Sequence, residues 1–292
     1  MTTDGFRRNS DNFCYRHPDR QSFVLCQRCL RTICPECQTP GAVGVICPEC
    51  LRDQQKAQSP AQKKAERRWS RPGAVSVSDS RPIVTYSIIA ITAFVYLLQL
   101  IPGLGPLVEQ NLLFYAPALY PELTGVFQPW RLLTGALVHS SFWHVGLNML
   151  ALWMIGRSLE PLLGRWRFLS LYVLSALGGS VAVALLSFAT PVVGASGAIF
   201  GLFGALVVIG RHIGANIAGI AIILGINLVI GFIPGFNVSW QAHIGGLVTG
   251  LLVGFLFVRT RSARQRNLQI MLLIAVAVAL LALLLVPAAL AG

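Results

Sequence analysis

Ser196 places a hydroxyl inside a run of glycine, alanine and apolar residues, GASGAIFG at 194–201. The surrounding sequence is apolar enough for a membrane helix, and lipid offers a hydroxyl no hydrogen-bond partner. Either a neighbouring helix satisfies this serine, or the serine is there to react. A serine in such a helix is commonly a packing residue that bonds the carbonyl four residues back. The polar groups expected near Ser196 therefore decide between the packing role and the reactive role.

His243 is the residue that we expect to act as the base for Ser196, because histidine is the usual partner of a nucleophilic serine. Small residues at four-residue intervals let helix backbones approach closely, and such rows follow both positions. The rows are Gly197 and Gly201 after Ser196, and Gly246, Gly250 and Gly254 after His243. Phe200, one turn below Ser196, is predicted to stack on the imidazole.

His144 and Asn148 are the predicted stabilisers of a developing negative charge. They lie four residues apart, so they share a helix face, and both can donate hydrogen bonds. The backbone N–H of Ser196 is a third donor, and removal of one oxyanion donor typically costs about 10²–10³ in rate. Glu160 lies about 18 Å deeper than Asn148 by helical rise, so it cannot orient His243. The sequence therefore predicts a Ser–His dyad.

Seven cysteines and one histidine near the N-terminus form four pairs with two-residue spacers. The pairs are Cys14 with His17, Cys26 with Cys29, Cys34 with Cys37, and Cys47 with Cys50. Eight such ligands suit two structural zinc ions, each with four protein ligands. An odd cysteine count in a cytoplasmic segment argues against disulfides. Alternate pairs or successive pairs could share a metal, and spacing alone leaves both open.

The composition is that of a polytopic membrane protein. The chain is 54% hydrophobic and 12% charged, whereas soluble domains carry about 25% charged residues. Seven apolar runs are candidates to span a bilayer. They are 83–101, 143–160, 166–187, 196–211, 216–233, 240–258 and 268–288. The connection at 102–142 is too apolar for a water-exposed loop, so we expect it to lie against the bundle.

Arginine and lysine residues set the predicted orientation. They concentrate before the first span and in alternate connections, whereas the connections 102–130, 188–195 and 234–239 contain none. Basic residues mark the cytoplasmic side of a membrane protein. We therefore expect a bacterial plasma-membrane protein with a cytoplasmic N-terminus and an external C-terminus. Ser196, His144 and His243 would then lie just below the outer surface.

Five sequence elements resemble motifs of the rhomboid family of intramembrane serine proteases. They are the GxSG motif at 194–201, HxxxxHxxxN at 139–148, AHxxG at 242–246, the dipeptide Trp130-Arg131, and GxxxE at 156–160. The resemblance implies Ser196 as nucleophile and His243 as general base. It implies an oxyanion hole of His144, Asn148 and the Ser196 N–H. It also implies supporting roles for His139, Gly194, Gly197, Phe200 and Gly246, and Phe200 stands where the family often has tyrosine.

The spacing of the N-terminal pairs is similar to that of small cross-braced zinc modules of the B-box type. That resemblance implies one zinc ion shared by the first and third pairs, which are Cys14, His17, Cys34 and Cys37. The second and fourth pairs, Cys26, Cys29, Cys47 and Cys50, would share the other. Modules of this type usually dock partners.

The expected fold is an all-α membrane protein. It comprises a rhomboid six-helix bundle, a C-terminal seventh transmembrane helix and a small N-terminal zinc-finger domain. The expected parts are a B-box-like double zinc-binding domain at 1–52, a basic linker at 53–82, the protease core at 83–258, and an Arg-rich cytoplasmic loop with the seventh helix at 259–292.

The expected function is a serine endopeptidase that cleaves transmembrane-helix substrates near the outer membrane surface, with no cofactor for catalysis. The connection at 234–241 would cap a cavity open to the outside. The expected partners are membrane-protein substrates, the lipid bilayer and a cytoplasmic protein for the zinc domain, and not nucleic acid. The alternative is a non-catalytic adaptor, but inactive relatives of rhomboids normally lose the serine or the histidine. A transporter would show repeats or buried charges, and we see neither.

Overall fold

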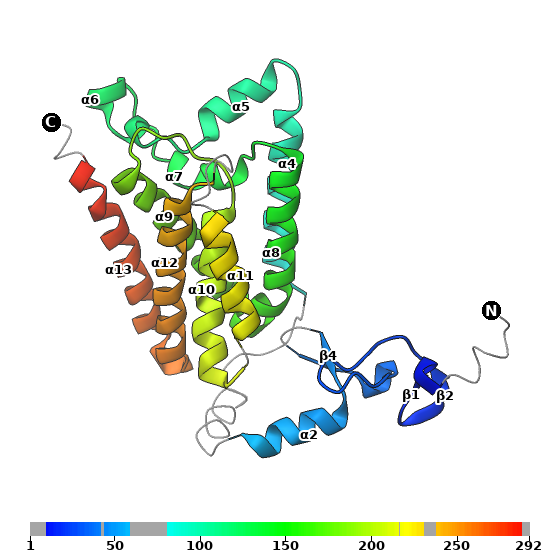
Figure 1. Ribbon diagram of the computed structural model, residues 1–292. Coiled ribbons are helices and arrows are strands. Elements are labelled where there is room, and N and C mark those ends of the chain that lie inside the picture. The colour runs from blue at the N-terminus through cyan, green and yellow to red at the C-terminus, as the bar shows by residue number, and fades with distance from the viewer. Residues whose placement is uncertain (1–9, 42–43, 59–80, 216, 231–237, 288–292) are drawn as a thin grey trace. The chain divides into compact units, whose positions relative to one another are not determined.

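The computed structural model describes residues 10–41, 44–58, 81–215, 217–230 and 238–287 (Figure 1). They belong to two compact units, which are described separately. Most of the expected linker, residues 59–80, and residues 234–237 of the expected cap lie outside the described residues.

The N-terminal unit has short elements built around its cysteines. In order they are η1 (Ser10–Asn12), β1 (Phe13–Cys14), β2 (His17–Gln21), η2 (Pro35–Cys37), β3 (Thr39–Pro40), β4 (Val45–Ile46) and α2 (Pro48–Ala57). Strands β1 and β2 pair antiparallel, as do β3 and β4. The core consists of Ile33 and six buried cysteines, and a unit this small needs more than apolar burial to stay folded. Helix α2 continues five residues past the expected boundary at residue 52.

The second unit is a bundle of long helices. They are α4 (Ile83–Gln99), α8 (Phe142–Leu163), α9 (Arg165–Leu186), α10 (Ser196–Ile213), α11 (Ala218–Ile230), α12 (Trp240–Arg259) and α13 (Arg266–Leu283), with η5 (Ala263–Gln265) before the last. Each coincides with one of the seven apolar runs. The predicted class, an all-α membrane protein with a small N-terminal Cys/His domain, is confirmed.

Four of the described helices are long and apolar enough to cross a membrane by themselves. They span 165–186, 196–213, 240–259 and 263–287. Helix α4 is a shorter apolar helix of 17 residues. Helix α8 is long enough, but His144, Asn148, Arg157 and Glu160 lower its mean hydropathy. Two of these polar residues, His144 and Asn148, belong to the candidate site.

The connection between α4 and α8 folds into short helices that lie against the bundle, as predicted. They are α5 (Leu104–Leu112), η3 (Ala116–Leu119), α6 (Pro121–Thr124), α7 (Arg131–Thr134) and η4 (Gly135–Leu137). Phe114, Tyr120 and Leu132 are buried in one cluster with residues of α9. The Arg131 guanidinium fixes the connection by donating to the carbonyl of Leu113 at 2.7 Å.

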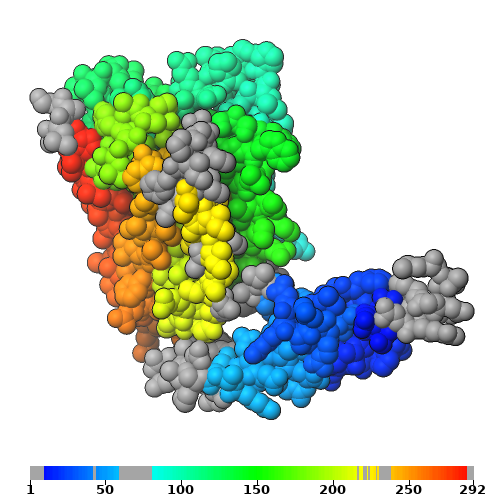
Figure 2. All heavy atoms as spheres, in the orientation of Figure 1, coloured from blue at the N-terminus to red at the C-terminus, as the bar shows by residue number. Residues whose placement is uncertain are grey.

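Glycines let α9, α10 and α12 meet at their backbones (Figure 1). A Cβ added to Gly246 would lie 1.9 Å from the carbonyl oxygen of Gly197, and one on Gly250 would lie 2.0 Å from that of Gly201. On the other side of α12, a Cβ on Gly245 would lie 2.3 Å from the carbonyl oxygen of Gly178 in α9. The space-filling view shows α10 and α12 in close contact on the face drawn (Figure 2).

Candidate active site and metal sites

Ser196 and His243 lie in contact at one end of the bundle. Helix α10 begins at Ser196, and His243 lies in the first turn of α12, whose N-cap Ser239 accepts a hydrogen bond from the Ala242 N–H. The Ser196 Oγ and the His243 Nε2 are 2.8 Å apart, which is hydrogen-bond distance. His243 is 6% exposed, so bundle packing holds the imidazole.

Phe200 covers the face of the His243 ring. The two ring centroids are 4.0 Å apart and the planes are inclined by 14°. The stacked position that the sequence predicted for Phe200 is therefore observed. The His243 Nδ1 is buried and has no hydrogen-bond partner among the described residues. A proton on Nδ1 would leave the Nε2 lone pair directed at the serine hydroxyl.

Glu160 binds the N-terminal end of α4 and does not contact His243. Its buried carboxylate accepts hydrogen bonds from the N–H of Val84 at 2.9 Å, from the N–H of Thr85 at 2.8 Å and from the Thr85 hydroxyl at 2.7 Å. A carboxylate at a helix N-terminus satisfies amides that lack an intrahelical partner. Glu160 thus closes the start of α4, and within the described residues the site has the composition of a dyad.

His144 and Asn148 lie on the first two turns of α8. The Ser141 Oγ caps this helix by accepting from the His144 N–H at 3.1 Å, and the Asn148 amide donates to the His144 carbonyl at 2.8 Å. The Asn148 amide has a second N–H, which leaves a donor for a ligand. A Cβ on Gly194 would lie 2.7 Å from the His144 Nε2, so this ring packs against the backbone two residues before Ser196.

His139 braces the backbone in front of Ser196. Its Nε2 accepts from the N–H of Ala195 at 3.3 Å, and its own N–H donates to the Gln99 side chain at 3.1 Å. The Gln99 amide in turn donates to the His139 carbonyl at 3.1 Å. Sequence reasoning missed Gln99, although a lone amide at the end of an apolar run was visible in the sequence.

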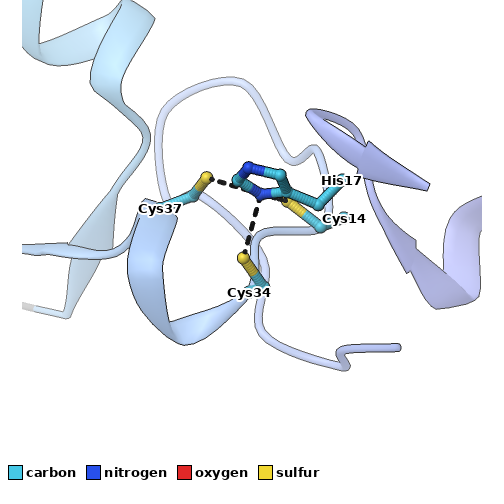
Figure 3. A group of neighbouring side chains, drawn as sticks. All are labelled: Cys14, His17, Cys34 and Cys37. Carbon is cyan, nitrogen blue, oxygen red and sulfur yellow. Dashed lines mark hydrogen bonds between the residues drawn. The ribbon is translucent and has the colours of Figure 1, made fainter. Parts of the chain in front are cut away.

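The N-terminal ligands form two groups, each with ligand atoms within 4.8 Å of one another. One group is Cys14, His17, Cys34 and Cys37, and the other is Cys26, Cys29, Cys47 and Cys50. Figure 3 shows the first group, in which the Sγ atoms of Cys34 and Cys37 each lie 3.4 Å from the His17 Nδ1. All seven cysteines are free thiols. Of the two pairings that the spacing left open, the structure has the cross-braced one.

The chemistry of these groups fits a divalent cation. Burial raises the pKa of the Cys37 thiol to about 11 and that of the Cys50 thiol to about 12, so a bound cation would favour the thiolate form of these two residues. The Arg31 guanidinium donates to the Cys29 Sγ at 3.3 Å, lies 4.0 Å above the Tyr15 ring and pairs with Glu49. Its positive charge would offset part of the negative charge of a four-thiolate site.

Comparison with known proteins agrees with this architecture. The rhomboid domain model matches residues 126–260, the part of the chain that contains the Ser196–His243 contact. The rhomboid protease GluP of Bacillus subtilis (strain 168) is 36% identical over 185 residues, which is 61% of this chain and 35% of GluP. The mitochondrial Rhomboid protein 1 of Saccharomyces cerevisiae (strain ATCC 204508 / S288c) is 36% identical over 151 residues, 46% of this chain and 44% of that protein.

YdcA, a rhomboid protein of Bacillus subtilis (strain 168), is 36% identical over 141 residues, which cover 46% of this chain and 70% of YdcA. The apolar helix bundle, with the half-buried Ser196 against the buried His243, is that of an integral membrane protein with a serine–histidine pair. The chain belongs to the rhomboid family. It spans about a third of the length of GluP, 35%, so the activity of the complete relatives is not transferred to it by similarity alone.

Proposed function

We propose that this chain is an intramembrane serine endopeptidase that cleaves transmembrane-helix substrates near the outer membrane surface. The observation that carries the proposal is the 2.8 Å separation of the Ser196 Oγ and the His243 Nε2 in a membrane-embedded bundle. The match to rhomboid proteases supports the same reaction class.

In the proposed reaction, the Ser196 Oγ attacks the scissile carbonyl and the His243 Nε2 takes its proton. The oxyanion is stabilised by the His144 Nε2–H, the Asn148 amide and the Ser196 N–H. The imidazolium then protonates the leaving amine, and an acyl ester remains on Ser196. His243 next takes a proton from water, and the resulting hydroxide attacks the ester. The imidazolium then returns the proton to the Ser196 Oγ as the ester bond breaks, which releases the new carboxyl end and restores both the serine and the neutral histidine.

The N-terminal unit is proposed to hold two structural zinc ions. One would be bound by Cys14, His17, Cys34 and Cys37, and the other by Cys26, Cys29, Cys47 and Cys50. Each ion would have four protein ligands and no open position, which suits a structural role. We propose a cytoplasmic side for this unit and an external C-terminus, because of the distribution of basic residues, and a protein partner for the unit on that side.

Cleavage by purified full-length protein in liposomes, with a single-span reporter substrate, tests the proposal. Wild-type protein should cleave, and the Ser196→Ala and His243→Ala proteins should not. Ser170→Ala is the matched control, because the hydroxyl of this half-buried serine donates to the Trp166 carbonyl of its own helix at 2.8 Å. Undiminished cleavage by the Ser196→Ala protein would rule the assignment out. Binding of the substrate without cleavage by wild-type protein would favour the adaptor.

A further inference from the structure

Ser140 contacts the imidazole of His144, and neither the expected mechanism nor the family motifs use it. The Ser140 Oγ lies 3.0 Å from the His144 Nδ1. The backbone N–H of Ser140 also points at this nitrogen, at 3.4 Å. Ser140 lies in the short connection between η4 and α8, four residues before the histidine, and is exposed.

The backbone N–H decides which nitrogen of His144 carries the proton. An amide N–H can only donate, so the Nδ1 that faces it must offer a lone pair. The Ser140 hydroxyl can donate to the same lone pair. A neutral imidazole with an unprotonated Nδ1 carries its proton on Nε2. The two groups of Ser140 therefore favour the Nε2–H tautomer of His144.

The Nε2 edge is the one directed toward the candidate active site. It packs against Gly194, whose missing side chain would otherwise lie 2.7 Å from Nε2 and 2.8 Å from Cε1. Gly194 adopts φ +118°, and its N–H donates to the Gly135 carbonyl at 2.9 Å, which fixes this backbone. The proton that Ser140 keeps on Nε2 is thus presented on the side of the nucleophile.

The ring of His139, which contacts that of His144, has the opposite tautomer, with its proton on Nδ1. Its Nε2 accepts from the Ala195 N–H, so its proton lies on Nδ1, which faces the Leu137 carbonyl at 3.4 Å. The two rings meet edge to face with centroids 4.9 Å apart. The surroundings that the two histidines share therefore do not impose one tautomer on both. The tautomer of each ring is set by its own backbone donor, the Ser140 N–H for His144 and the Ala195 N–H for His139.

We propose that Ser140 is a positioning residue, which holds His144 as a neutral Nε2–H donor for the oxyanion through the Oγ–Nδ1 and N–Nδ1 hydrogen bonds. This inference rests on the proposed function, because the donor matters only if an oxyanion forms at Ser196. Loss of the Ser140 hydroxyl leaves only the longer hydrogen bond from the Ser140 N–H to the His144 Nδ1. The Nδ1–H tautomer of His144 and other orientations of its ring then become populated.

Kinetics of the full-length protein give the first readout. Ser140→Ala should lower kcat about 3- to 10-fold, as expected for one hydrogen bond, and should leave KM unchanged, because the substrate ground state carries no oxyanion. Ser140→Thr keeps the hydroxyl and should restore kcat to within about twofold. Ser170→Ala should match wild type. An unchanged kcat in Ser140→Ala, or a thermal unfolding shift that accounts for its loss, would overturn the proposal.

Nitrogen NMR of the ¹⁵N-histidine-labelled protein in lipid nanodiscs gives a readout independent of activity. The His144 signals are assigned by their disappearance in His144→Ala. Wild-type and Ser140→Thr proteins should show an unprotonated Nδ1 and a protonated Nε2, and Ser140→Ala should show a mixture. A proton on Nδ1 in the wild type would refute the role of Ser140. If the NMR result is as expected but wild-type protein does not cleave, the proposed function fails and the tautomer assignment stands.

Discussion

Gly194 is the residue at which backbone shape and the proposed chemistry meet. Its φ of +118° lies in a region that L side chains rarely adopt, and its missing Cβ leaves room for the His144 imidazole. The same residue shapes the turn that delivers Ser196 to the first position of α10. A glycine is thus required two residues before the proposed nucleophile for two reasons, the backbone conformation and the space that the His144 ring occupies.

Gly194→Ala is predicted to abolish most activity. The added methyl would meet the His144 Nε2 at 2.7 Å, so the ring must move away from the oxyanion position. Displacement of one oxyanion donor should lower kcat about 10²- to 10³-fold. Steady-state cleavage of the reporter substrate measures this. Activity within threefold of wild type would show that His144 does not need its present position.

Residue identities were predictable here where chemistry restricts the choice, and contacts were less so. The contact of Ser196 with His243 and the stacking of Phe200 were predicted from residue types and glycine spacing, and both are observed. The roles of Ser140 and Gln99 did not, because both depend on the conformation of the residues before α8. Two serines precede His144 at 140 and 141, and sequence alone cannot tell that one caps the helix while the other faces the ring.

Helices α10 and α12 approach so closely at their glycines that no side chain fits between the two backbones. Gly250→Ala should push the helices apart, because its Cβ would lie 2.0 Å from the Gly201 carbonyl oxygen, an atom of the backbone. We expect a destabilisation of about 1–3 kcal/mol, and loss of cleavage as the Ser196–His243 contact lengthens. Thermal unfolding and the cleavage rate, measured on one preparation, test both.

Gly225→Ala is the matched control for that substitution. Gly225 lies in α11, and a Cβ there would meet no described atom within 4 Å. Alanine is favoured over glycine in helices by up to about 1 kcal/mol, so this protein should be as stable as wild type or more so. Equal effects of the two substitutions would show that close helix approach is not what Gly250 provides.

Glu160 joins two helices that are far apart in sequence. Glu160→Gln keeps the shape but replaces a charged acceptor by an amide, one end of which would face the N–H groups of α4. Hydrogen bonds to charged groups contribute about 1.5–3 kcal/mol, so we expect the free energy of unfolding to fall by about 2 kcal/mol. Chemical or thermal unfolding in detergent measures it. An unchanged midpoint would mean that Glu160 is not needed at the start of α4.

The elements themselves were predictable because apolar runs in a membrane protein must form helices. Within the described residues, each of the seven runs contains one of the long helices. The partner of Glu160 was not predictable, since Val84 and Thr85 lie 76 and 75 residues away in sequence. Spacing left two pairings open for the cysteines, and only the fold brings Cys14 to Cys34 and Cys26 to Cys47.

The whole molecule combines a helical bundle with a unit whose core consists of Ile33 and cysteines that could hold metal ions. Metal analysis of the full-length protein should give about two zinc ions per chain. His17→Ala removes one ligand of a single group, so about one ion should remain, while Ser196→Ala should keep both. Less than one zinc per chain in the wild type would contradict the assignment. Equal loss from both groups in His17→Ala would show that they are not separate sites.

The most direct test of the proposed dyad is the reactivity of the Ser196 hydroxyl and its dependence on His243. A serine activated by a base attacks the phosphorus of a fluorophosphonate probe and expels fluoride, and mass spectrometry of the digested protein locates the adduct. We predict an adduct on Ser196 in wild-type protein and none in the His243→Ala protein. An unlabelled Ser196 in folded wild-type protein, or equal labelling without His243, would contradict the dyad.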